Sequence, residues 1–185
     1  SSAASDVYKR QLSGIKKLKA YTSGGKVNRL RVDMGKAILD PKEIPVVLDG
    51  DKVVDRPVEI AGKNYNITCV SMGNPHCVVF MDDIDNLDIE TVGPEFENDK
   101  LFPERVNTEF VTVLDDHTIK MRVWERGSGE TWACGTGACA VAVAACENGF
   151  CKKGEDIKIK LKGGDLIINY TDETASVSYT HLRAH

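Results

Sequence analysis

The segment 137–148 constrains the fold most, because its small apolar side chains, GACAVAVAACEN, cover nearly the whole circumference of a helix. A helix that is apolar all round cannot lie on a surface and has to be enclosed by other elements. Asn148 and Gly149 form a typical C-terminal stop for such a helix. The sequence therefore predicts one buried helix with the rest of a domain built around it.

Short strand patterns make up most of the remaining sequence. Apolar and polar residues alternate over 26–34, and 65–71 and 76–81 are rich in β-branched and aromatic residues. A short helix is expected near Ile89. Further strands of the same character are expected over 107–114, 119–124, 157–161 and 166–170, with weaker candidates at 46–48 and 53–60 and turns at Asp49-Gly50 and Ala61-Gly62. The predicted fold class is α+β, with short mixed strands wrapped around a buried central helix.

The two ends of the chain lack such patterns. Residues 1–11, SSAASDVYKRQ, show no periodicity, and residues 177–185, VSYTHLRAH, end without a structural stop signal. We expect a leader and a tail that do not belong to the natural gene. No strand is recognisable after Tyr170, and the segment 36–45, with two prolines, is expected to be a linker.

Composition excludes some classes of function. The net charge of −4 leaves no basic excess to neutralise phosphates, which argues against nucleic acid as the main partner. No stretch of about 18 apolar residues is present, so no membrane-spanning helix is expected. The six cysteines are concentrated near one apolar helix and no export signal opens the chain, which favours reduced thiols in a cytoplasmic protein.

Cys134 stands out among the cysteines because Gly135, Thr136 and Gly137 follow it directly, at the start of the predicted helix. The positive end of a helix dipole and its unpaired N–H groups lower the pKa of a thiol at this position. The same N–H groups can hold a substrate carboxylate. A free cysteine is commonly a small buried hydrophobe, and this alternative stays open.

The other cysteines are expected to be structural. The spacings contain no CxxC pair with matching histidines, so the sequence argues against a zinc site or any other metal site. We expect four of these cysteines in the core and one on a surface loop, namely Cys69, Cys77, Cys139 and Cys146 in the core and Cys151 on the surface.

A loose dinucleotide fingerprint, Gly135-x-Gly137-x-x-Ala140 with Glu155 further on, overlaps the same helix. The fingerprint needs a buried apolar strand directly before it, whereas 126–131 is polar and rich in glycine. The next strand alternates with lysines, which does not suit a buried parallel sheet. The pattern therefore gives little support to a dinucleotide cofactor.

Four polar residues near turns are further candidates. Glu125 and Arg126 end a strand shortly before Cys134, and Arg126 could grip a carboxylate with two parallel hydrogen bonds. His76 follows a turn at a strand entrance, and Asn107 begins a strand. Solvated charges, a structural histidine and a turn-capping asparagine are the simpler interpretations.

Four segments together resemble the diaminopimelate epimerases in order and spacing. They are MGNPHC at 72–77, Gly93-Pro94, FPERVNTEF at 102–110 and WERGSGETWACGTGACA at 124–140. The resemblance runs from about Ser13 to Tyr170. The related proline racemases and phenazine-type isomerases share the fold but lack this combined pattern.

The resemblance implies a cofactor-free interconversion of LL- and meso-diaminopimelate, in the synthesis of lysine and cell-wall precursors. Two cysteines on opposite sides of the substrate α-carbon exchange its proton, and Cys134 matches the second of them. The other roles fall on matching positions. Gly135 and Thr136 would hold the reacting carboxylate through their N–H groups, and the distal end of the substrate would be held by Asn74, Asn107 and Arg126. Glu125 and His76 would assist proton handling, and Glu125 also belongs to the substrate-binding set.

The resemblance also implies that the chain is the later of two similar halves. Residues 12–35 correspond to remnant strands of the first half, and 36–176 to the C-terminal epimerase domain. The first catalytic cysteine, in a CGNG-type motif, is absent. We therefore predict that this chain alone does not epimerise, and that the full-length protein can be a homodimer. Two alternatives stay open: another cofactor-independent amino-acid racemase or epimerase of the same fold, and a non-catalytic amino-acid-binding module.

Overall fold

The computed structural model describes residues 3–11 and 14–180, and within them the side chains of residues 17–179. The described residues form two helices, α1 (Ile89–Glu97) and α2 (Gly135–Glu147), and one twelve-stranded sheet. The strands are β1 (Ala3–Gln11), β2 (Gly14–Ser23), β3 (Lys26–Asp33), β4 (Arg56–Ile60), β5 (Lys63–Ser71), β6 (Pro75–Phe80), β7 (Asn107–Asp115), β8 (Thr118–Glu125), β9 (Gly129–Thr131), β10 (Asp156–Leu161), β11 (Gly164–Tyr170) and β12 (Ala175–Thr180).

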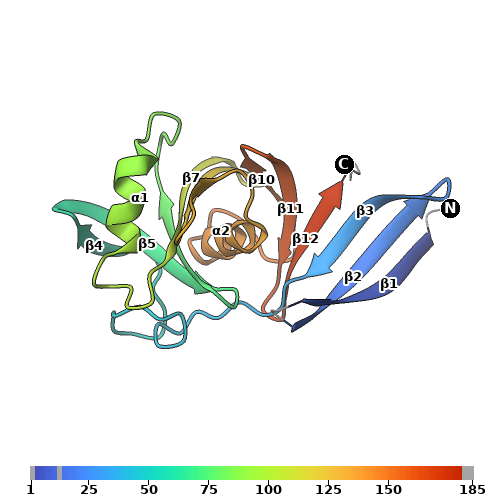
Figure 1. The fold of residues 1–185 in the computed structure, drawn as a ribbon, viewed down its shortest axis with the longest axis horizontal. Helices are drawn as coiled ribbons and strands as arrows, with labels where there is room; N and C mark the ends of the chain where they lie inside the picture. Colours follow the sequence, from blue (N-terminus) through green and yellow to red (C-terminus); the bar gives the residue numbers. More distant parts are fainter. Residues whose placement is uncertain (1–2, 12–13, 181–185) are drawn as a thin grey trace.

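The strand order in the sheet is β1-β2-β3-β12-β11-β10-β8-β7-β6-β5-β4, with the short β9 paired to β8 off this path. Neighbours are antiparallel except for the parallel pairs β6 with β7 and β10 with β8. The sheet curves around α2, while β1 to β3 extend away from it as an arm (Figure 1). Within the described part of the chain, neither helix is long and apolar enough to cross a membrane.

The prediction of an enclosed central helix is confirmed. Every residue of α2 from Ala138 to Ala145 has no exposed surface. Side chains from β5, β6, β7, β8, β10, β11 and β12 complete the core around it. The alanines and glycines of α2 allow the surrounding strands to approach closely, which a helix of larger residues would prevent.

Helix α1 covers the opposite face of β5 to β8. Successive strand residues point to opposite faces, so Val70 and Val78 pack with α2 whereas Cys69 and Cys77 pack with α1. The ring of Phe96 in α1 lies edge-on to Phe110 and Tyr65, at centroid distances of 5.4 and 4.9 Å. Figure 1 shows the two helices on either side of β5 and β7.

Several local predictions need correction. Residues 46–48 form no strand, and 53–60 contributes only β4, because Val46 and Val53 pack in the core on the α1 side outside any ladder. Asp49-Gly50 makes no hairpin, whereas Ala61-Gly62 joins β4 to β5 as expected. The linker at 36–45 is held against β5 by the bridge between Ile38 and Ser71.

Two further corrections concern Cys151 and the end of the chain. Cys151 is buried in the core around α2, not on a surface loop. The prediction that no strand follows Tyr170 is wrong, since β12 pairs with both β11 and β3, and its Ala175 and Val177 are fully buried. The segment ASVSYT does alternate apolar and polar residues as a strand should, but the expected tail at 177–185 divides it and leaves only Ala175 and Ser176 inside the predicted domain. At the other end, β1 pairs with β2 along its length; the foreign origin of both ends stays a prediction.

Candidate active site

Cys134 occupies the N-cap position of α2, as the sequence predicted. Its backbone is extended (φ −142°, ψ 102°), and Sγ accepts a hydrogen bond of 3.2 Å from the Gly137 N–H. The Thr136 hydroxyl lies 3.6 Å from Sγ. The first N–H groups of any α-helix have no acceptor within the helix, so the amides of Gly135 and Thr136 are available beside the thiol.

The two glycines next to Cys134 are places of close approach. A Cβ at Gly137 would lie 2.7 Å from Glu109 Oε1 and 3.0 Å from the Cys134 Sγ, and one at Gly135 would lie 3.1 Å from the Tyr179 hydroxyl. A side chain at Gly137 would force the Glu109 carboxylate and the Cys134 thiol to move, and one at Gly135 would press on the Tyr179 hydroxyl. The glycine pattern that resembles a dinucleotide fingerprint therefore has a packing cause, because it brings a carboxylate and a thiol together.

A chain of polar groups, buried at Glu109 and His76 and partly exposed at Asn74 and Thr136, leads to the thiol. Glu109 Oε1 lies 2.7 Å from His76 Nδ1, and both side chains are fully buried. His76 Nε2 lies 2.9 Å from Asn74 Oδ1, and Asn74 Nδ2 donates to the Thr136 hydroxyl over 3.4 Å. The chain thus connects β7, β6 and the turn before β6 to the first turn of α2, next to the Cys134 sulfur.

Burial and a nearby negative charge reverse the expected direction of the pKa shift of Cys134. Burial first, and then the negative charge of Glu109, raise the pKa of the Cys134 thiol to about 12, although the Thr136 hydroxyl and the Gly137 N–H lower it. Burial likewise raises the pKa of Glu109, against the opposing effect of His76. The prediction of a lowered thiol pKa is therefore wrong for this chain, because the helix terminus is outweighed by desolvation and a nearby carboxylate.

Asn107 links the turn after β8 to the turn before β6. Its Oδ1 accepts the backbone N–H of Arg126 over 2.9 Å, and its Nδ2 donates to the carbonyl of Pro75 over 3.1 Å. The Arg126 guanidinium donates to the carbonyl of Glu104 over 3.0 Å. Asn107 thus holds Arg126 near the segment that carries Asn74.

Glu125 lies close enough to Cys134 for its charge to raise the thiol pKa. Its carboxylate accepts a hydrogen bond from the hydroxyl of Thr131 in β9. The structure thus brings Cys134, Thr136, Asn74 and His76 into one connected group, with Glu125 beside it, while Asn107 and Arg126 join the group through the backbone of Pro75.

Two residues of this group were missed by the sequence interpretation. Glu109 is a single carboxylate between Thr108 and Phe110, in the part of β7 that is fully buried. A charged side chain at such a position is rare unless it is paired, which was a usable signal. Tyr179 lies in β12, within the segment that was set aside as a tail, so the sequence interpretation could not place it at the α2 terminus.

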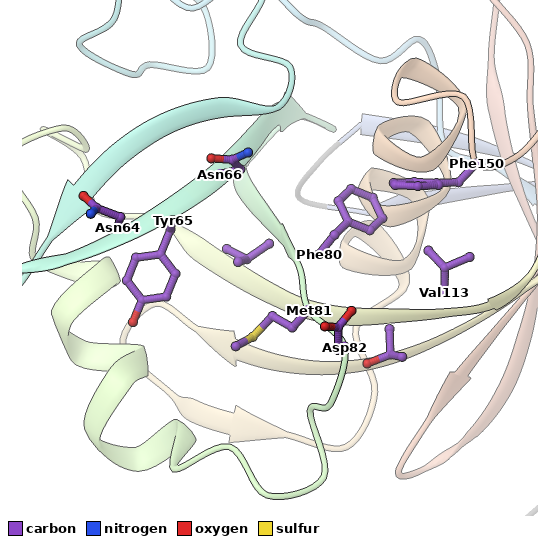
Figure 2. Close-up of a pocket in the computed structure, with 10 residues that line it drawn as sticks. Asn64, Tyr65, Asn66, Phe80, Met81, Asp82, Val113 and Phe150 are labelled. Carbon is purple, nitrogen blue, oxygen red and sulfur yellow. The ribbon is translucent and has the colours of Figure 1, made fainter.

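A separate cavity of about 690 Å³ lies on the sheet away from these residues. It is lined from β5, β6 and β7 and by Phe150, whose ring contacts that of Phe80 at a centroid distance of 4.9 Å (Figure 2). No member of the Cys134 group lines it. The six thiols, all in the described region, are free of disulfides.

The part of the chain from residue 68 to 183 matches the family model described as diaminopimelate epimerase. Curated diaminopimelate epimerases from Agathobacter rectalis and Acetivibrio thermocellus are each 50% identical to it, over 91% of this chain. The match covers 61% and 60% of these relatives, so the chain spans about three fifths of their length.

Solved structures show the same fold at low sequence identity. A hydroxyproline epimerase from Agrobacterium vitis, with bound trans-4-hydroxy-L-proline, is 13% identical with a TM-score of 0.65, over 96% of this chain and 58% of that one. A phenazine biosynthesis protein from Bacillus anthracis is 13% identical with a TM-score of 0.60, over 95% of this chain and 65% of that one. These likenesses agree with the predicted α+β class.

Proposed function

The chain belongs to the diaminopimelate epimerase family, and we propose that it is part of an enzyme that interconverts LL- and meso-diaminopimelate without a cofactor. The observation that supports this most is the place of the Cys134 sulfur. It lies at the start of α2 between first-turn amides and the hydrogen-bonded chain of Glu109, His76 and Asn74. A proton donor and an anion-binding helix terminus therefore meet at one point.

The proposed binding mode follows from these groups. The backbone N–H groups of Gly135 and Thr136 would donate hydrogen bonds to the carboxylate next to the reacting carbon, because a helix N-terminus favours an anion. As the α-proton leaves, negative charge grows on this carboxylate and the same dipoles stabilise it. Asn74, Asn107 and Arg126 would hold the distal amino-acid end of the substrate.

The proposed proton transfer uses Cys134 as the acid in its resting state. Its raised pKa keeps the proton on sulfur at neutral pH. A base on the opposite side of the substrate takes the α-proton, the carbanion takes the proton from the Cys134 thiol, and a thiolate remains. The Gly137 N–H and the Thr136 hydroxyl are placed to stabilise that thiolate, with Glu125 and His76 assisting the return of a proton.

The opposite base is expected outside this chain. One thiol cannot both remove and return a proton on opposite faces of a carbon, so we propose that the chain alone does not epimerise. We further propose that the complete enzyme acts in the cytoplasm, in the synthesis of lysine and cell-wall precursors, and that it can assemble as a homodimer.

The test joins this chain to the part of the Agathobacter rectalis relative that the chain does not match. Diaminopimelate is incubated in D₂O with this fusion, and deuterium at the α-carbon and the ratio of stereoisomers are followed by NMR. We expect exchange and interconversion by the fusion and neither by the chain alone. Cys134→Ser in the fusion should abolish both, and Cys146→Ser, a change at a thiol on the far end of α2, should leave them unaffected.

Three results would contradict parts of the proposal. Interconversion by the chain alone would refute the need for a second base. A folded fusion that binds diaminopimelate without α-exchange would favour the amino-acid-binding module. Exchange on proline or hydroxyproline in preference to diaminopimelate would indicate another racemase of the same fold.

A further inference from the structure

Glu97, at the end of α1, is a buried carboxylate that gathers three N–H donors from outside its helix. Its Oε2 accepts the indole N–H of Trp124 over 2.7 Å. Its Oε1 accepts the Gly127 backbone N–H over 2.8 Å and the Arg105 guanidinium over 2.9 Å. Only 8% of the Glu97 side chain is exposed. A carboxylate this buried is kept in place by its partners, because an unpaired one would be costly.

These partners belong to the segment that carries the candidate binding residues. Trp124 directly precedes Glu125 and Arg126, and Gly127 directly follows them. The N–H of Arg126 is held by Asn107 and the N–H of Gly127 by Glu97. Two side chains from other elements thus fix two successive amides of this turn.

The packing of Trp124 strengthens the link between α1 and the turn. A Cβ at Gly93 would lie 2.3 Å from the Trp124 ring, so α1 is in direct contact with the indole. Gly129, at the start of β9, lies against the other end of the same ring, with a Cβ position 3.5 Å away. The indole is therefore held between α1 and β9, with its N–H directed at Glu97.

We propose that Glu97 is a positioning residue, which fixes the turn 125–127 so that Arg126 and Glu125 face the substrate site. The inference rests on the proposed function for what the turn binds, and on the three hydrogen bonds for how it is held. Glu97 touches no reacting atom in this role. Loss of the Glu97 carboxylate should therefore speed amide exchange in the turn more than in the sheet.

The first test measures amide hydrogen exchange by NMR in the full chain, in Glu97→Ala and in Glu90→Ala. Glu90 lies in the same helix and is exposed, and Glu90→Ala removes the same charge and the same side-chain atoms as Glu97→Ala. Loss of a hydrogen bond to a charged group predicts exchange at Gly127 that is about tenfold faster or more in Glu97→Ala. Val123, inside β8, should exchange alike in both variants. Equal exchange at Gly127 in both would overturn the proposal.

A milder variant applies if Glu97→Ala does not fold. Glu97→Gln keeps the shape but has a single oxygen, so the indole N–H of Trp124 or the pair of donors from Gly127 and Arg105 must lose its acceptor. Faster exchange at one of these sites, with Val123 unchanged, is the expected result. Unchanged exchange at all of them would overturn the proposal.

The second test separates positioning from a merely structural role. Binding of diaminopimelate and of norleucine, which lacks the whole distal amino-acid end, is titrated by NMR against the fusion described above and against its Glu97→Ala variant. Positioning predicts about a tenfold loss of affinity for diaminopimelate and a smaller loss for norleucine. Equal losses, or none, would overturn it. A fusion that binds neither ligand would refute the proposed function, while the exchange result would still decide whether Glu97 holds the turn.

Discussion

Two histidines of this protein pair with carboxylates at the same distance but in opposite surroundings. His76 lies 2.7 Å from Glu109 with both side chains fully buried, at the candidate active site. His117, in the hairpin between β7 and β8, lies 2.7 Å from both Asp116 and Glu155, but its side chain is half exposed. The distances are alike, so the difference in consequence has to come from solvent. Water screens the exposed group, whereas the buried pair cannot lose a partner without leaving a desolvated polar group.

The largest effect is expected from breaking the buried pair. Glu109→Ala leaves His76 buried without its partner and should lower the free energy of unfolding by about 3 kcal/mol. The matched change, Asp116→Ala, removes a carboxylate from His117 and should hardly change the stability. Urea unfolding at neutral pH measures both. Equal losses in the two variants would show that burial does not distinguish the clusters.

A smaller effect is expected from titrating the exposed cluster. The hydrogen bond to Asp116, followed by that to Glu155, raises the pKa of His117 above its ordinary value of 6.5. A histidine whose pKa is raised on folding stabilises the fold fully below 6.5, and this stabilisation is lost as the pH rises through the raised value. The stability of wild type relative to His117→Asn should therefore decline above pH 6.5. A difference that grows with pH would contradict this assignment.

The sequence predicted the enclosed helix because its composition admits one solution, and it placed Cys134 at the start of that helix because glycines follow it. It could not predict the thiol pKa, since that depends on Glu109, which lies 25 positions earlier and reaches the sulfur only through the fold. The sequence interpretation missed β12 because it assigned residues 177–185 to a tail, which divides an otherwise alternating segment. Cys151 was misplaced because burial of a loop depends on which strands pack over it.

Local patterns therefore predicted the scaffold better than the electrostatics of the site. The roles of these five residues, Asn74, His76, Asn107, Glu125 and Arg126, rest on matching positions in the family. The structure adds that Asn74, His76 and Glu125 lie near the start of α2, with Asn107 and Arg126 linked to them through the backbone of Pro75. It also shows that Asn107 binds backbone on two sides, so its structural role exists in the chain without any ligand.

The most direct test of the account is the pH dependence of alkylation at Cys134, followed by mass spectrometry of its peptide, in the folded chain and in Glu109→Gln. Normalising each profile to its plateau removes the effect of limited access. The account predicts a midpoint far above the free-thiol value of about 8.5, near the pKa of about 12 given by burial and Glu109, and a lower midpoint in Glu109→Gln. A midpoint at or below about 8.5 in the wild-type chain, unchanged by Glu109→Gln, would contradict a thiol that burial and Glu109 keep protonated.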